Sequence, residues 1–236
     1  MGARELLAVA IASVLASWHA AAAGEAPGDC RGVDFNVAHP VAIAKIIADE
    51  RQVHFVKSTV DDASCPAAAA ACQHPAYLVP GDLVLIGKTH GDFTCVSYES
   101  PAARKPQWTN GWIETASMTP IRLAPAPARA DWLGSWLHAA GHITIGPARH
   151  GAVIVRGEAF YAAAQNVHTG VIHATAEPAH GLLEFADDGG APFDKVSDDK
   201  GLCLVRMQRV EKVLVVEDNG KCGGVLVTFT GFYRRK

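Results

Sequence analysis

Short apolar runs separated by turn residues dominate the chain between residues 53 and 123. Clusters such as Pro80-Gly81-Asp82, His90-Gly91-Asp92 and Asn110-Gly111 stand between them. Short strands punctuated by Gly, Pro and Asn are typical of a small β-barrel. We therefore predict strands at residues 53–56, 77–79, 83–86, 93–98 and 112–113.

The segment before these strands has a different spacing. Ile43, Ile46 and Ile47 share one face of a helix, and Pro40 suits a first helical turn. The pattern predicts one short helix within residues 40–50.

A Pro/Ala stretch divides the chain. Residues 124–130 alternate Pro with small residues, which favours an extended spacer. We therefore expect an N-terminal domain at residues 24–123 and a second domain at 131–236. Together the patterns predict an all-β protein made of two small barrels and one short N-terminal helix.

The second half also has a strand pattern. Its last three predicted strands form an antiparallel meander, with Val225, Val227 and Phe229 on the inward face of the third. The strands expected in this half lie at residues 142–145, 152–155, 181–185, 202–207, 212–216 and 225–230.

The first 23 residues have the layout of a secretory signal peptide. Arg4 precedes an apolar run at residues 6–16, and Ala21-Ala22-Ala23 offers a cleavage site. The run is shorter than the roughly 20 residues that span a bilayer. We expect a periplasmic or secreted protein without a membrane span after cleavage.

All six cysteines follow this leader, and an even number in an exported chain predicts disulfides. The meander brings Cys222 back to Cys203, which predicts one bridge. Cys30, Cys65, Cys72 and Cys95 are expected to pair among themselves. A local Cys65–Cys72 bridge is one choice, and their connectivity stays open.

Composition narrows the function classes. The chain is 49% hydrophobic and 19% charged, so it can build a core. Its formal charge of -3, with no basic run, argues against a nucleic-acid partner. The sequence lacks Gly-x-Ser-x-Gly, His-Glu-x-x-His and a helix-initiating Cys with a downstream His after the spacer. We expect no enzyme activity and no cofactor.

Residues 52–123 resemble bacterial Src-homology-3-like domains. The resemblance rests on Gly81-Asp82 before a Val-rich strand, on Gly91-Asp92-Phe93, and on Gly111-Trp112. The Cys-bearing insert at residues 62–74 departs from that pattern. The resemblance implies binding of peptides or cell-wall strands in a groove that Tyr77, Phe93, Tyr98, Trp108 and Trp112 line or support. Phe93 and Trp112 are alternatively core residues.

The loop at residues 102–112 mixes cations with aromatic side chains beside the expected groove. Trp and Arg often dominate interfaces. Alternatively, Trp108 folds back over the end of the barrel. The predicted ligand-binding residues are Tyr77, Tyr98, Arg104, Lys105, Trp108 and Trp112.

The second half is similar to lipocalin-type barrels. The residues concerned are Gly134-x-Trp136 near its start and Tyr233-Arg234-Arg235 at its end. The resemblance implies a Trp at the barrel base covered by a C-terminal cation. Its length is nearer to that of small periplasmic lysozyme-inhibitor barrels.

These patterns predict an exported, non-catalytic binding protein of the cell envelope. Its partner would be a cell-wall peptide or glycan, or a secreted protein such as a lysozyme or toxin. The alternatives are a cell-wall hydrolase or a metal-binding protein using His138, His142, His150, His168, His173 and His180. Asp187, Asp188, Asp194, Asp198 and Asp199 suggest either a calcium site or a hydrated loop.

Overall fold

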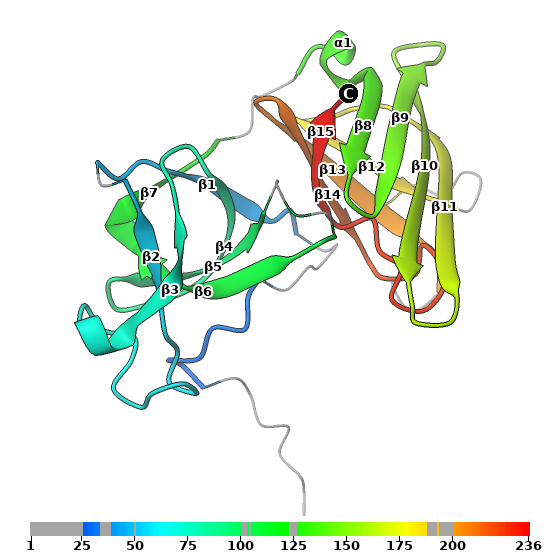
Figure 1. Cartoon of the computed structure of the whole chain (residues 1–236). Helices are drawn as coiled ribbons and strands as arrows, with labels where there is room; N and C mark the ends of the chain where they lie inside the picture. Colours follow the sequence, from blue (N-terminus) through cyan, green and yellow to red (C-terminus); the bar gives the residue numbers. More distant parts are fainter. Residues whose placement is uncertain are drawn as a thin grey trace, which may run out of the picture.

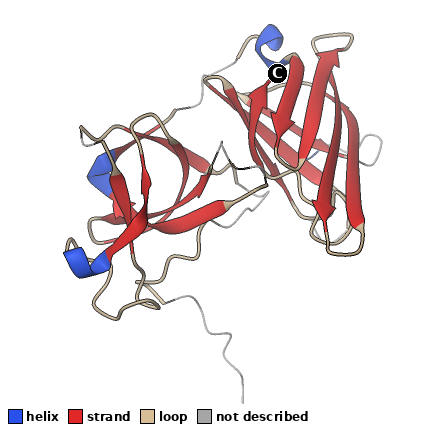
Figure 2. Cartoon of the chain, in the orientation of Figure 1, coloured by secondary structure: helices blue, strands red, loops and turns tan. Residues whose placement is uncertain are grey.

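The computed structural model shows a chain of two antiparallel β-sheets (Figures 1 and 2). It describes residues 26–33, 39–49, 51–100, 103, 105–122, 127–187, 193 and 201–236. The all-β class predicted from the sequence is confirmed. The expected signal peptide and residues 124–126 of the expected spacer lie outside the described residues. Within the described part, no helix is long and apolar enough to cross a membrane.

The first sheet has seven strands in the order β3-β2-β6-β5-β4-β1-β7. Val84, Val96 and Ile113 are fully buried in its core. The 62–74 insert contains the short turn η1 (Ala70–Cys72), and η2 (Thr115–Ser117) precedes the last strand. The strands are β1 (Ala42–Ile46), β2 (Val53–Val56), β3 (Gln73–Leu78), β4 (Leu83–His90), β5 (Phe93–Glu99), β6 (Trp108–Glu114) and β7 (Met118–Pro120).

The helix predicted within residues 40–50 is wrong, because Ala42–Ile46 is strand β1. Ala44 and Ile46 face the core of the first sheet, whereas Ile43 packs against the second sheet. A strand buried on both faces loses the alternation that marks a half-buried strand. The isoleucine spacing therefore resembled one face of a helix.

The second sheet has eight strands and nearly closes into a barrel. Each strand is hydrogen-bonded to the next along the chain, except that β11 and β12, the two edges of the sheet, are in contact without forming a ladder. β15 also pairs with β8, which joins the end of the barrel to its start. The barrel begins with the one-turn helix α1 (Arg129–Trp132), so the last two residues of the expected extended spacer are helical instead. Its strands are β8 (Gly134–His138), β9 (Gly141–Pro147), β10 (Val153–Ala162), β11 (Val167–Ala176), β12 (Leu182–Ala186), β13 (Leu204–Val210), β14 (Val213–Asp218) and β15 (Gly231–Arg235).

The third strand of the predicted closing meander is displaced. Residues 225–230 are a turn and an irregular segment, and the strand follows at β15. Val227 and Phe229 point into the barrel core, but Val225 and Leu226 are exposed at the turn. An apolar run that plugs the end of a barrel has the composition of a strand, which explains the error.

Buried side chains close both ends of this barrel. At one end Trp132 of α1 is fully buried, and its carbonyl accepts a hydrogen bond from the Trp136 indole (3.0 Å). At the other end the segment 219–230 runs under the barrel and reaches β11 through a Gly224–Thr169 backbone hydrogen bond. The barrel interior is therefore a packed core.

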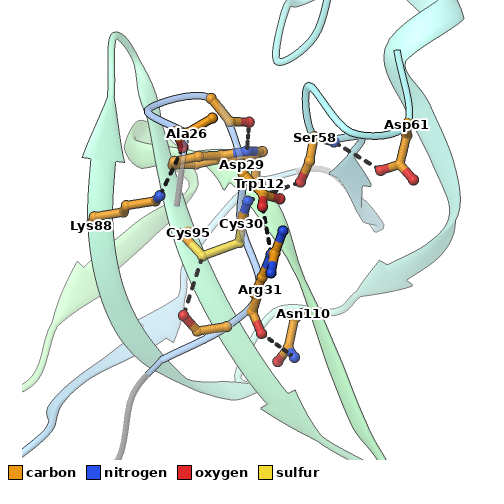
Figure 3. Close-up of polar contacts among 12 residues, drawn as sticks. Ala26, Asp29, Cys30, Arg31, Ser58, Asp61, Lys88, Cys95, Asn110 and Trp112 are labelled. Carbon is orange, nitrogen blue, oxygen red and sulfur yellow. Dashed lines mark hydrogen bonds and ion pairs between the residues drawn. A yellow bond between two sulfur atoms is a disulfide. The ribbon is translucent and has the colours of Figure 1, made fainter. Parts of the chain in front are cut away.

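Three disulfides stabilise the chain. Cys203–Cys222 joins the start of β13 to the segment that closes the barrel, as the sequence predicted. Cys65–Cys72 closes the insert of the first sheet, and Cys30–Cys95 fastens the N-terminal segment to β5 (Figure 3). No described cysteine is free.

Candidate functional site

The two sheets meet through an apolar contact. Ile43 of β1 and Leu85 of β4 pack against Val210 and Val215, which point outward from the barrel. All four side chains are buried. Burial of apolar surface on both sides gives this junction a continuous packed centre.

A buried polar network lies beside that centre. Glu217 of β14 accepts hydrogen bonds through Oε1 from the Val41 backbone N–H (3.1 Å) and the Gln208 amide (3.0 Å). The Gln208 amide also donates to the Val41 carbonyl (3.1 Å). Burial raises the pKa of Glu217, and these hydrogen bonds offset only part of the rise.

A buried pair joins the sheets a short distance away along the junction. Glu99 Oε1 lies 2.6 Å from His138 Nε2, and their side chains are only 5% and 4% exposed. Because His138 Nδ1 accepts from the Ala140 N–H (3.3 Å), the Nε2 proton is directed at the Glu99 carboxylate. Glu99 Oε2 accepts from the Phe232 N–H (2.8 Å), and the Tyr233 ring stacks on His138 at 4.9 Å. Hydrogen bonds and the Tyr233 ring therefore fix the positions of both side chains.

Two hollows lie along the junction next to this pair. The larger has a volume of about 600 Å³ and the smaller about 320 Å³, sizes usual for ligand pockets. Both are lined by Glu99, Phe232 and Arg234, so they are adjacent and lie on either side of these shared side chains. We call the two hollows together the junction groove.

The larger hollow places an aromatic side chain of the first sheet opposite the second. Tyr98, Asp82 and Leu83 form one wall, and Lys212, Val213 and Phe232 form the other. Partial burial raises the pKa of Tyr98, and the nearby Asp82 carboxylate raises it further. Tyr98 therefore enters the groove as a neutral hydroxyl at neutral pH.

The smaller hollow is lined mainly by short or apolar side chains and by cations. Leu137 and Ala139 come from the second sheet, and Ser100 and Ala103 follow β5. Arg234 and Arg235 supply positive charge. This hollow therefore combines an apolar wall with guanidinium groups.

The structure brings only part of the predicted binding set to this groove. Tyr98 lines it, and the Trp108 ring packs on Phe232 with ring centres 6.0 Å apart. Trp108 is partly buried in the junction, where it packs against the second sheet and is not an exposed anchor. Lys105 is exposed, and Arg104 lies outside the described residues.

Tyr77 and Trp112 lie elsewhere. Tyr77 is 47% exposed on β3, with its ring centre 5.7 Å from that of His54. Trp112 is fully buried and presents no exposed surface in this structure. Its indole N–H donates to the Gly28 carbonyl (3.0 Å) beneath the N-terminal segment that Cys30–Cys95 holds in place (Figure 3). Phe93 is likewise buried in this cluster.

A third hollow, of about 530 Å³, borders the insert of the first sheet. Ala67, Ala70, His54 and Glu114 are among its lining residues. None of the predicted binding residues lines it. The Cys65–Cys72 bridge fixes the loop that forms its wall.

The sequence missed the contributions of Phe232, Arg234 and His138 to the junction groove. The alternation of β15 was the available signal, because Tyr233 points into the barrel and Phe232 and Arg234 therefore point out. Which surface those residues face depends on how the two sheets pack, which a sequence pattern does not encode.

The cation expected at the barrel base is present. The Arg235 guanidinium lies 5.4 Å from the Trp136 ring centre, and that of Arg209 lies 4.8 Å from it. Burial and the neighbouring Arg235 lower the pKa of Arg209. The two cations cover the ring where α1 closes the barrel.

The histidines of the second half do not form a metal site in the described part of the chain. There, no three His, Cys, Asp or Glu side chains gather in an arrangement that could hold a metal ion. Of the aspartates considered for calcium, only Asp187 is described. In comparisons with known proteins, no family model, no curated protein and no solved structure matches the chain.

Proposed function

We propose that the chain is an exported, non-catalytic binding protein of the cell envelope whose ligand, a cell-wall peptide or glycan, occupies the junction groove. The observation that carries this proposal is the groove itself. Both sheets line it, and it offers the aromatic side chains Tyr98 and Phe232 beside the cation Arg234. Aromatic walls with a few polar groups are typical of sites for small extended ligands.

Several further features support the proposal. The three disulfides fit an oxidising compartment, and the leader-like first 23 residues fit export. The Trp136–Arg235 contact supports the lipocalin-type resemblance of the second half.

Binding is favoured over catalysis by the state of the two buried titratable groups. Both ring nitrogens of His138 are engaged, one with Glu99 and one with the Ala140 N–H. Both Glu99 oxygens are also occupied. Groups held in this way fasten the sheets together and are poorly placed to move a proton to or from a ligand.

The concave shape of the junction groove favours a peptide or glycan over a globular partner such as a lysozyme. A short extended ligand buries most of its surface in hollows of this size, whereas a folded partner needs a broad contact of about 800 Å² on each side.

Co-sedimentation of the oxidised protein with purified peptidoglycan tests the proposal. Leu137→Glu places a carboxylate on the groove wall directly across from Arg234 in the β8–β15 pair. Val171→Glu adds the same charge at a site on β11 that is 65% exposed. We expect wild type and Val171→Glu to sediment with the polymer and Leu137→Glu to remain in solution.

Failure of the wild type to sediment would overturn the proposal. Equal sedimentation of Leu137→Glu and wild type would move the site away from the junction groove. A third arm with soluble lysozyme distinguishes the protein partner, because inhibition of lysozyme without polymer binding would favour that alternative.

A further inference from the structure

Arg234 occupies an unusual position in the junction groove. Its direct cross-strand neighbours are Leu137 on β8 and Val213 on β14, both apolar. The side chain is exposed, and it lines both hollows. Within the described part of the chain, its guanidinium makes no hydrogen bond and no ion pair.

The acidic groups near Arg234 are engaged with other partners. Glu99 is bound to His138 and to the Phe232 N–H. Glu211 pairs with Lys45, and Asp82 accepts from the Val79 N–H (2.9 Å). In the smaller hollow Glu99 is the only acidic side chain among the described lining residues, and it faces both Arg234 and Arg235, so the charge around a ligand there is positive.

The guanidinium group favours one kind of anion. Arginine presents a planar fork of N–H donors that matches a carboxylate with two parallel hydrogen bonds. Here that fork stands between apolar walls formed by Leu137 on one side and Phe232 with Val213 on the other.

We infer that Arg234 binds the free α-carboxylate of a short peptide, with the terminal residue in the smaller hollow. The apolar and short side chains there, Ala103, Leu137 and Ala139, suit a small apolar terminal side chain. The preceding residues then run into the larger hollow past Tyr98 and Phe232. This inference rests on the proposed function and specifies the ligand group that the groove recognises.

Such a carboxylate has two sources, the stem peptide of the cell wall and the C-terminus of a secreted protein. Three synthetic probes separate them by calorimetry: acetyl-glycyl-D-alanyl-D-alanine, its all-L isomer and the amide of the D-peptide. We expect an acid to bind at least tenfold more tightly than the amide. A preference for the D-acid assigns the wall source, and a preference for the L-acid assigns the protein source.

Two variants and a control locate the carboxylate contact. Arg234→Met keeps the length and apolar stem but removes the charge, and we expect it to reduce affinity for the acid at least tenfold while leaving the amide unchanged. Arg234→Lys keeps the positive charge without the planar guanidinium group, so its affinity for the acid should lie between those of wild type and Arg234→Met. Arg149→Met removes an exposed arginine from the turn after β9 and should bind like wild type.

Equal affinity for acid and amide, or unchanged acid binding by Arg234→Met with an unchanged melting temperature, would overturn the inference. So would failure of every peptide to bind. If the polymer still sediments with wild type and not with Leu137→Glu, these results reject the carboxylate contact alone. Failure of polymer sedimentation rejects the proposed function, whichever peptide binds.

Discussion

Glu99 of the first sheet and His138 of the second lie 2.6 Å apart, although 39 residues separate them in the chain. The contact is almost completely buried, and the second Glu99 oxygen holds the start of β15 through the Phe232 N–H. Phe232 and Arg234 therefore have a fixed position relative to Tyr98. These contacts hold the side chains around the junction groove in place, and under the proposed function such preorganisation lowers the ordering cost of binding.

Glu99→Ala should lower the free energy of unfolding by about 3 kcal/mol, because it leaves the buried His138 and Phe232 N–H groups without an acceptor. Denaturant unfolding measures this loss. Glu158→Ala, at an exposed position on β10, should change stability by less than about 0.5 kcal/mol. Equal stability of the two variants would show that the pair does not fasten the sheets.

Gly231 has no side chain, and the Glu99–His138 pair lies against the position that a Cβ would take. A Cβ at this position would lie 2.7 Å from His138 Nε2 and 3.0 Å from Glu99 Oε2. Gly231→Ala should therefore cost about 1–3 kcal/mol of stability by forcing these groups apart. Gly146→Ala is the control, since no atom lies within 4 Å of its Cβ position. Thermal unfolding of both proteins checks the difference.

Trp108→Ala should destabilise the fold by about 2–3 kcal/mol, because the ring packs on Phe232 between the sheets. Tyr77→Ala removes an aromatic ring of which nearly half is exposed and should cost less than about 1 kcal/mol. Chemical unfolding of both variants tests this order. A larger loss for Tyr77→Ala would contradict the placement of Trp108 in the junction.

We expect the stability of the protein to depend on pH through the buried carboxyl group of Glu217. Burial raises its pKa in the folded state, so the folded protein binds this proton more tightly than the unfolded chain. The resulting stability is fully present below the ordinary glutamate pKa of about 4.3 and is lost as the pH rises through the raised pKa.

Glu217→Gln removes that titration. The unfolding free energy of wild type minus that of Glu217→Gln should therefore fall as the pH rises above about 4.3. Urea unfolding at a series of pH values measures the difference, with exposed Glu158→Gln as a control that should give no slope. A difference that grows with pH would mean that Glu217 is held as a favourable anion.

Much of the fold could be predicted from local pattern. The alternation and turn residues gave the class, β2 was predicted to the residue, and the meander placed Cys222 beside Cys203. Two errors have one physical cause. Ile43 in β1 and Val227 in the closing segment are buried by contacts distant in sequence, so their apolar neighbours do not follow the period of a half-buried element.

The candidate site was less predictable. Tyr98 and Trp108 were singled out through the Src-homology-3-like resemblance and, for Trp108, the loop that mixes cations with aromatic side chains. The junction groove also depends on Phe232 and Arg234, more than a hundred residues later. Trp112 is also a tryptophan that was expected to bind a ligand, but it is fully buried because the N-terminal segment covers it. The spacing of nearby residues does not predict that the second sheet covers Trp108 or that the N-terminal segment covers Trp112.

Hydrogen–deuterium exchange with and without soluble peptidoglycan fragments tests the central claim most directly. We predict slower exchange on binding at residues 98–100, 137–139 and 232–235, which come from both sheets and meet at the junction groove. Residues 67–73 at the hollow beside the insert should exchange at the same rate with and without the fragments. Protection confined to residues 67–73, with none at the junction, would contradict the account.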